Sequence, residues 1–236
     1  MDVTGQLDAA MLSETVAFGE LLRGADQSVP VPTCPEWNVK QLFRHLGRGN
    51  RWSAQIVAGR RTEPLDPREV TGGKPPEGAD AEIEWLNDGA QALLDAVDRT
   101  GAQTPVWTFI GPKPAHWWIR RRVHETTLHR ADLALALGAP FALDPELAAD
   151  GITETLERAG WYPGRPEPVE PGTSLTLQAT DSDAHWRLGD GPGVTVRGPL
   201  TGLLLAATRR QSAHDAEVLV TGDQSVWQTW LDRTAY

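Results

Sequence analysis

The hydrophobic residues of this chain recur at helical spacing over its first 160 residues and alternate as in strands after residue 170. A period of 3.6 indicates amphipathic helices, and a period of two indicates strands with one buried face. Helices connected in this way predict an antiparallel four-helix bundle. The later change of period predicts a separate, small α+β domain. The four expected helices cover residues 6–23, 38–57, 81–99 and 114–138.

We expect the bundle to occupy residues 1–142 and the α+β domain to occupy residues 143–236. The second part starts with a helix and a proline-rich connection at 163–172. Clusters of Gly, Asp and Ser then separate short alternating segments, which is typical of hairpin turns. The expected elements are helices at 145–160, 200–210 and 224–231, strands at 175–179, 186–188, 194–196 and 217–220, and turns at 181–183 and 189–193.

Composition excludes several classes of function. The formal net charge of −10 argues against a nucleic-acid partner, whose phosphates such a surface would repel. No apolar stretch approaches the roughly 20 residues that span a bilayer, and the N-terminus lacks the pattern of a secretion signal. Cys34, the single cysteine, fits a reducing compartment and a buried structural role. We therefore expect a cytoplasmic monomer whose partners are small molecules.

The start of the second helix carries a capping signal. Asn38 and Gln41 form a capping box, and Trp37 before it can pack on Leu42 as a hydrophobic staple. On the helix that follows, His45 lies about 60° from Leu42, at the edge of the apolar arc. This histidine can therefore face the inside of a bundle without being central to its packing.

Ionisable residues occupy one face of the fourth helix. Glu125 and His129 are four residues apart, which on a helix places their Cβ atoms roughly 5–6 Å apart on one face. The same face continues through Trp118 and Asp132, and apolar residues flank it on both sides. The residues expected on the opposite, solvated face are Arg120, Thr127, Arg130 and Ala134.

Two explanations fit this face. Burial of a carboxylate and an imidazole costs free energy unless they pair or bind a metal. Spacing alone favours a buried Glu125–His129 hydrogen bond, with His45 an unrelated surface histidine, because Glu-x-x-x-His is common on helices. The position in the middle of an apolar arc favours a metal site instead.

Two motifs carry a family resemblance. The first runs from Cys34-Pro35-Glu36-Trp37-Asn38-Val39 into His45-Leu46-Gly47, and the second is Arg122-x-His124-Glu125-x-x-x-His129-Arg130-x-Asp132. They resemble the mycothiol-dependent maleylpyruvate isomerase family, part of the DinB-like (YfiT-like) metalloprotein superfamily. The resemblance extends over nearly the whole chain, more loosely in the stretch 199–210. It implies a DinB-like four-helix bundle, the family's small C-terminal α+β domain and an actinobacterial source.

The resemblance further implies a metal site and a cosubstrate. It implies that His45, Glu125 and His129 are ligands of a divalent metal, usually zinc. It also implies that the thiol cosubstrate is mycothiol. Two imidazoles and one carboxylate leave a coordination position open, as catalytic zinc requires. The metal would lower the thiol pKa, so that sulfur attacks the second substrate as thiolate. Family members isomerise a cis double bond by thiol addition and elimination, or transfer the thiol to an electrophile.

Other residues are candidates for binding the substrates. Arg210 matches the arginine that the family is thought to use for a substrate carboxylate, and Arg209, where the family usually has glycine, is the alternative. We expect Arg122, Trp118 and Trp52 to contact the thiol. The alternatives are a solvated basic helix start for the arginine and core packing for the tryptophans.

Asp132 lies on the same helix face as His129. It can accept a hydrogen bond from the second ring nitrogen of that histidine. An ion pair with Arg121 or Arg130 is an equal alternative, and Arg121 is expected, like Arg122, at a solvated helix start.

Two other functions remain open. One is a metal-dependent hydrolase that uses the same three residues, with water in the open position and no thiol. The other is a bundle that binds a ligand without catalysis, with a structural metal or none. An assay without thiol separates the first from a thiol-dependent enzyme, and metal analysis tests the second.

Overall fold

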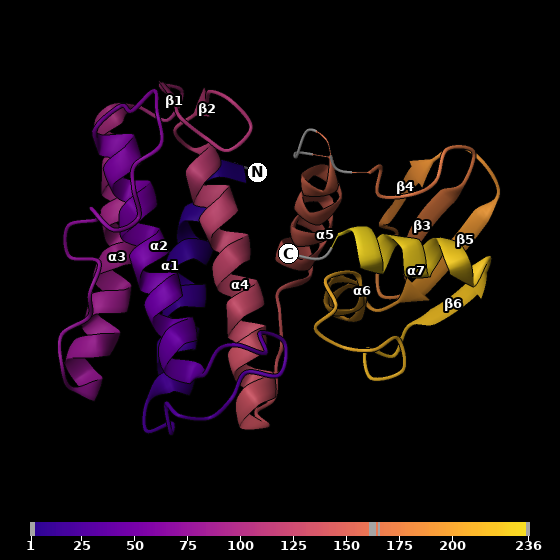
Figure 1. Ribbon diagram of the computed structural model, residues 1–236, viewed down its shortest axis with the longest axis horizontal. Coiled ribbons are helices and arrows are strands. Elements are labelled where there is room, and N and C mark those ends of the chain that lie inside the picture. The colour runs from indigo at the N-terminus through magenta and orange to yellow at the C-terminus, as the bar shows by residue number, and fades with distance from the viewer. Residues whose placement is uncertain (1–2, 161–163, 165, 235–236) are drawn as a thin grey trace. The chain divides into compact units, whose positions relative to one another are not determined.

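A computed structural model describes residues 3–160, 164 and 166–234 of the chain. It divides into two compact units, Met1–Phe141 and Ala142–Tyr236, which are described separately (Figure 1). Part of the proline-rich connection predicted at 163–172 lies outside the described residues. Within the described ranges, no helix combines the length and apolar character needed to cross a membrane.

The first unit consists of four long helices and a small two-stranded ribbon. The fourth helix was predicted to start near Pro114, but it starts at Trp117, because Lys113 and Pro114 pair with Pro105 and Val106 instead. Its predicted end is confirmed, since Gly138 caps it with a left-handed backbone. The elements are α1 Val3–Leu22, α2 Val39–Ala58, α3 Ala79–Thr100, β1 Pro105–Val106, β2 Lys113–Pro114 and α4 Trp117–Leu137.

The predicted capping box fixes the start of α2. The Asn38 side chain accepts a hydrogen bond from the Gln41 backbone N–H at 3.0 Å, and the Gln41 side chain accepts one from the Asn38 N–H at 2.9 Å. These bonds satisfy two backbone donors that the first turn of a helix leaves unpaired. The position of His45, two turns further on, follows from this start.

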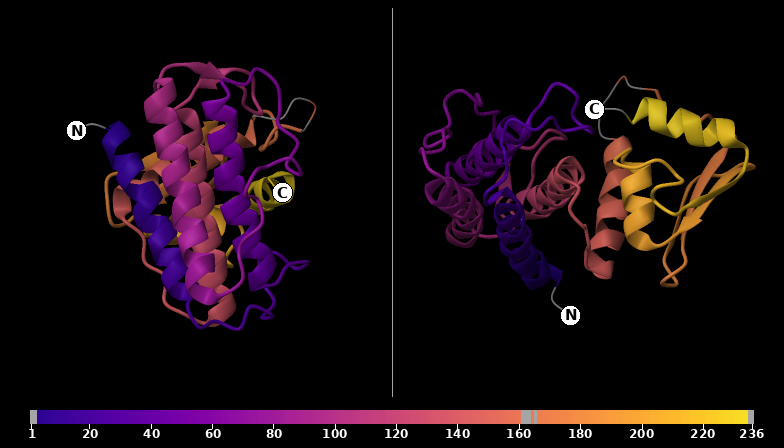
Figure 2. Two further views of the ribbon diagram at one scale, coloured as in Figure 1. Left: turned by 90° about the vertical axis from the view of Figure 1, so that its left-hand side faces the viewer. Right: turned by 90° about the horizontal axis from the view of Figure 1, so that it is seen from below.

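Helix directions in the bundle are mixed. Contacts of Glu125 with His45 and of Arg122 with Asn50 show that α2 and α4 are antiparallel. Helices α2 and α3 run in the same direction, because Trp85 lies against Gly47 and the next turn of α3, at Gly89, lies against Arg51. The connection 59–78 makes this possible by returning along the bundle, where Figure 2 shows it beside the helices.

Gly47 is required by the contact between α2 and α3. A Cβ atom at this position would lie 2.0 Å from the Trp85 ring. The ring cannot easily move, because its Nε1 donates to the Gly72 carbonyl at 2.8 Å and the Arg51 guanidinium lies 4.4 Å from its centroid. The motif glycine therefore allows two parallel helices to approach closely.

Replacing Gly47 with alanine is expected to lower the free energy of unfolding by about 2 kcal/mol, because overpacking outweighs the roughly 1 kcal/mol that alanine gains in helix propensity. Denaturant unfolding of the two proteins measures the difference. Gly160→Ala is the control, since a Cβ there meets its nearest atom at 3.7 Å. Equal stability of Gly47→Ala and the parent would contradict the close-packing explanation.

The prediction that one face of α4 is solvated is wrong. Thr127, Arg130 and Ala134 are all buried. Arg130 reaches α1, where its Nε and Nη2 donate to the two carboxylate oxygens of Glu14 at 2.9 and 3.2 Å. A buried cation is tolerated because it has this two-bond carboxylate partner.

The second unit holds a four-stranded sheet with the order β4-β3-β5-β6. Helices α6 and α7 pack on β3 and β5, and α5 packs on α6. Leu175 and Leu177 of β3 lie beside Val194 and Val196 of β5, and all four are buried. The elements are α5 Pro145–Ala159, β3 Ser174–Ala179, β4 His185–Gly189, β5 Gly193–Gly198, α6 Leu200–Ala207, β6 Leu219–Gly222 and α7 Gln224–Arg233.

The turn at 189–193 is not the predicted hairpin. Strand β5 does not pair with β4 but lies parallel to β3 on its other side. The segment crosses the start of β3 so closely that a Cβ at Gly191 would lie 1.7 Å from the Gly172 carbonyl oxygen, and one at Gly193 would lie 1.8 Å from that of Ser174. The glycines in this segment allow two stretches of backbone to cross closely. A crossing of this kind has the same amino-acid composition as a tight turn.

The ends of two further elements differ from prediction. Helix α6 ends at Ala207, and the backbone N–H groups of Arg209 and Arg210 donate back to Ala206 and Leu205. This Schellman cap places Arg209 at a φ of 60°, a backbone region that glycine favours. Strand β6 starts at Leu219 and not at Glu217, whose φ of 56° is incompatible with a strand.

Candidate metal centre

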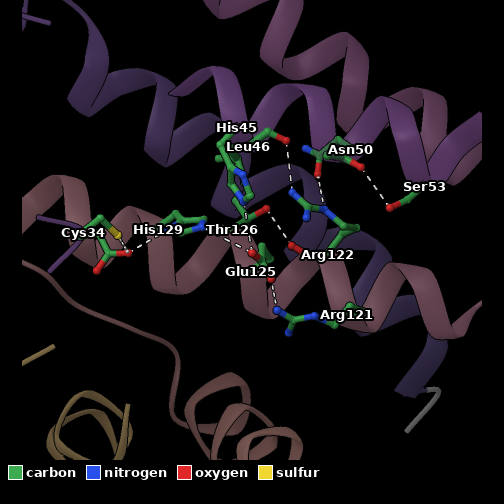
Figure 3. Close-up of polar contacts among 12 residues, drawn as sticks. Cys34, His45, Leu46, Asn50, Ser53, Arg121, Arg122, Glu125, Thr126 and His129 are labelled. Atoms are coloured by element: carbon green, nitrogen blue, oxygen red, sulfur yellow. Dashed lines mark hydrogen bonds and ion pairs between the residues drawn. The ribbon is translucent and has the colours of Figure 1, made fainter. Parts of the chain in front are cut away.

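Three side chains from α2 and α4 converge inside the first unit. Glu125 Oε1 lies 3.4 Å from His45 Nε2 and 3.4 Å from His129 Nε2. One ligand atom from each of the three residues lies within 4.8 Å of the others. Figure 3 shows His45 extending from α2 toward Glu125 and His129 on the antiparallel α4. The structure thus brings together the three candidate ligands predicted from the sequence.

The spacing of these atoms fits a divalent metal. Two ligand atoms that each lie about 2.0 Å from a tetrahedral zinc are about 3.3 Å apart, which follows from the tetrahedral angle. The two His–Glu separations of 3.4 Å agree with that value. Nitrogen and carboxylate donors are also the ligands of catalytic zinc sites. The site can therefore hold such an ion with three protein ligands.

A buried carboxylate orients His129. Asp132 is fully buried, and its Oδ2 lies 2.8 Å from His129 Nδ1. Thr33 donates to the other carboxylate oxygen at 2.6 Å. Because an acceptor faces Nδ1, that nitrogen carries the proton and Nε2 presents its lone pair to the site. Of the two roles considered for Asp132, the structure therefore shows the hydrogen bond to His129.

Replacing Asp132 with asparagine is expected to lower zinc affinity about 10–100-fold, because a neutral amide replaces the charged carboxylate that accepts from His129 Nδ1 and raises the basicity of the ligand. Competitive titration against a zinc chelator measures the change. The control is Asp95→Asn, which alters an exposed carboxylate on α3. An unchanged affinity in the Asp132 variant would remove this residue from the site.

Arg121 holds the other oxygen of Glu125. Its Nη2 forms an ion pair with Glu125 Oε2, so Oε1 is the oxygen that faces the two histidines (Figure 3). The prediction that the two arginines lie at a solvated helix start is wrong, since Arg121 is 7% exposed and Arg122 is 6% exposed. The i,i+4 spacing of Arg121 and Glu125 was the signal in the sequence that could have predicted this contact.

Trp37 packs against both histidines. Its ring centroid lies 4.8 Å from that of His45 and 6.1 Å from that of His129. Burial lowers the pKa of His45 to about 2, and the positive charge of Arg122 acts in the same direction. His45 is therefore neutral at ordinary pH, which is the form that binds a metal.

Arg122 is a buried cation beside this site. Its Nε donates to Asn50 Oδ1 at 2.8 Å and its Nη2 donates to the Leu46 carbonyl at 3.2 Å. Burial, followed by the charge of Arg121, lowers its pKa to about 9, so it remains charged at neutral pH. Among the described residues, no carboxylate pairs with it. Arg122 therefore supplies a positive charge near the three candidate ligands that no carboxylate of the described residues pairs with.

Trp52 and Trp118 belong to an aromatic cluster with Trp107. The Trp52 and Trp118 rings meet edge to face at 5.2 Å, and Trp118 Nε1 donates to the Trp107 carbonyl at 2.9 Å. Trp118 is buried and Trp52 is half-buried. These contacts support the core packing considered above, and thiol binding by either residue stays a prediction.

A second group of possible ligands fits a metal less well. Cys34, His129 and Asp132 also lie close together, and Cys34 is half-buried where a buried position was expected. The His129–Asp132 separation of 2.8 Å is a hydrogen-bond length and is shorter than the roughly 3.3 Å expected between two zinc ligands. Cys34 Sγ is 4.0 Å from the Asp132 carboxylate. The geometry therefore favours His45, Glu125 and His129.

Arg209 and Arg210 lie in the second unit. Arg209 Nη1 donates to the Leu231 carbonyl at 2.7 Å, and Arg210 Nη1 donates to the Thr208 carbonyl at 3.0 Å. Both side chains are half-buried. Their role toward a substrate stays a prediction.

Comparison with known proteins identifies the family. The model of the mycothiol maleylpyruvate isomerase N-terminal domain matches residues 9–134, and the model of the C-terminal domain of the same family matches residues 146–229. The chain belongs to the mycothiol maleylpyruvate isomerase family. It is thus a member of an enzyme family, as the resemblance implied.

Individual proteins and solved structures that resemble this family member share between 18% and 26% of its sequence. The chain is similar to uncharacterized proteins of two Mycobacterium tuberculosis strains, each 26% identical over 160 residues, which is 64% of this chain and 79% of theirs. Its fold matches a crystal structure of a mutant mycothiol-dependent maleylpyruvate isomerase with a TM-score of 0.66 and 18% identity, covering 92% of both chains. A second crystal structure of the mycothiol-dependent maleylpyruvate isomerase matches with a TM-score of 0.60 and 20% identity, covering 89% of this chain and 90% of the other.

Proposed function

We propose that this chain is a zinc-dependent enzyme that uses mycothiol, either to isomerise a cis double bond or to transfer the thiol to an electrophile. The observation that supports it is the convergence of His45 Nε2, Glu125 Oε1 and His129 Nε2 at zinc-ligand spacing. Membership of a family named for a mycothiol-dependent isomerase supplies the cosubstrate. Cytoplasmic location and a monomeric state stay predictions.

The residues around the site support a reaction of anionic sulfur. A divalent metal held by the three ligands would lower the pKa of the thiol, so that it is present as thiolate at neutral pH. Arg121 orients Glu125, and Asp132 keeps the His129 lone pair directed into the site. The charge of Arg122 favours a negative group nearby, and we assign it, with Trp118 and Trp52, to binding the thiol.

The second substrate would be oriented by an arginine of the second unit. Arg210 is assigned to hold a substrate carboxylate, where its charge also stabilises negative charge that develops in the transition state. Arg209 is the alternative. Its side chain is tied to the Leu231 carbonyl of α7, whereas Arg210 bonds within its own turn.

A thiol-dependence assay tests the proposal. The zinc-loaded protein is incubated with maleylpyruvate or with an alkylating electrophile, with and without mycothiol. An isomerase requires thiol without consuming it, and a transferase consumes one thiol for each product formed. Removal of zinc by a chelator is expected to abolish either activity.

The same assay separates the alternatives. Turnover of an ester or amide that is equally fast without thiol would show a hydrolase. Absence of both zinc binding and mycothiol binding would show a non-catalytic protein and would contradict the proposal.

A further inference from the structure

A cavity of about 820 Å³ lies within the first unit, with His45 in its wall. The segment 73–78 and Glu82 of α3 also line the cavity. His45 faces Glu125 with its Nε2, yet 36% of its side chain is exposed. The wall also includes Trp37, which precedes α2, and the α2 residues Lys40, Gln41, Arg44, His45 and Arg48. We call this cavity the basic groove.

The basic groove carries an excess of positive charge. Its cations are Lys40, Arg44, Arg48 and Lys74. Two carboxylates line it, those of Glu77 and Glu82, and Glu82 accepts a hydrogen bond from Gln27 at 2.6 Å. Among the described residues, no carboxylate forms an ion pair with any of the four cations. Such an unpaired cluster is notable in a chain whose net charge is −10.

The row of cations on α2 destabilises this helix when no anion is bound. Lys40, Arg44 and Arg48 follow each other at four-residue intervals, so that neighbouring cations repel along one helix face. Lys40 also lies in the first turn, where the helix dipole is already positive. An anion in the groove would relieve both repulsions, and the walls of a cavity strengthen its attraction.

We propose that the basic groove binds a small polyanion, a molecule that carries a phosphate or two carboxylates. Four cations exceed the two carboxylates by two charges, which a dianion balances. The volume lies within the roughly 300–1,000 Å³ of small-molecule sites, and Trp37, Pro75 and Pro76 offer apolar contact to a carbon skeleton. This site goes beyond the proposed function, because binding requires neither zinc nor thiol.

Isothermal titration calorimetry of the metal-free protein at low salt tests the proposal. Inorganic pyrophosphate and succinate are the two probes, and dimethyl succinate is the uncharged control. We expect one anion to bind each chain, dimethyl succinate not to bind, and affinity to fall as salt is added. Tighter binding of pyrophosphate identifies a phosphate ligand, and tighter binding of succinate identifies a carboxylate ligand.

Charge reversal locates the site. The double variant Arg44→Glu/Arg48→Glu is expected to weaken binding at least 10-fold, and Arg44→Gln/Arg48→Gln serves if the first variant fails to fold. The control is Arg99→Glu, which alters an exposed arginine near the other end of α3. Failure of both anions to bind the parent, or equal binding by the parent and the double variant, would overturn the proposal. Because zinc is absent, this outcome is independent of the thiol assay.

Discussion

Replacing Glu125 with glutamine is expected to lower zinc affinity by more than about 100-fold and to abolish thiol-dependent activity. Loss of a residue that hydrogen-bonds to a metal ligand reduces metal affinity by about 10–100-fold. Loss of a charged ligand itself should reduce the affinity further. The amide has the size of the carboxylate, so the packing between α2 and α4 changes little. Zinc titration against a chelator and the thiol assay measure the two effects.

The control for this variant is Glu84→Gln, which makes the same chemical change at an exposed position of α3. It should bind zinc and turn over substrate like the parent. Circular dichroism and the unfolding midpoint of Glu125→Gln establish that its loss is local, since the variant also leaves Arg121 without this ion-pair partner. Full zinc binding by folded Glu125→Gln would remove Glu125 from the ligand set.

Arg130→Met is expected to lower the free energy of unfolding by about 3–5 kcal/mol, because removing one member of a buried ion pair leaves the other charge uncompensated. Glu14 would remain on α1 opposite an apolar side chain, having lost two hydrogen bonds. Arg130 follows His129 directly in the family motif, yet its guanidinium contacts α1 and the ring of Phe141. Its role in the motif is therefore assigned to stability.

A double variant distinguishes this explanation from simple loss of packing. Glu14→Leu/Arg130→Met replaces both charges with apolar groups and should recover most of the lost stability. Denaturant unfolding of the parent, both single variants and the double variant completes the cycle. A double variant as unstable as the sum of the single ones would contradict an ion-pair origin.

Much of the first unit could be predicted from local patterns. The capping box at Asn38 set the start of α2, and Gly138 set the end of α4, because both act over a few residues. The spacing of Glu125 and His129 indicated a shared face for the same reason. The addition of His45, however, came from the family resemblance, since no local pattern relates residues on different helices.

Most of the errors share a physical cause, which is that long-range packing leaves no local signature. Arg130 is charged, and the sequence does not show that it meets the carboxylate of Glu14 on α1, which permits its burial. The segment 189–193 has the composition of a turn, but its glycines allow a backbone crossing over the start of β3. Trp37 was predicted to act as a hydrophobic staple, and its packing on two histidines depends on the pairing of α2 with α4.

The most direct test of the account is a crystal structure of the zinc-soaked protein, with data collected on both sides of the zinc absorption edge. The account predicts one anomalous peak within about 2.0–2.2 Å of His45 Nε2, Glu125 Oε1 and His129 Nε2. A peak among Cys34, His129 and Asp132, or no peak between α2 and α4, would contradict it.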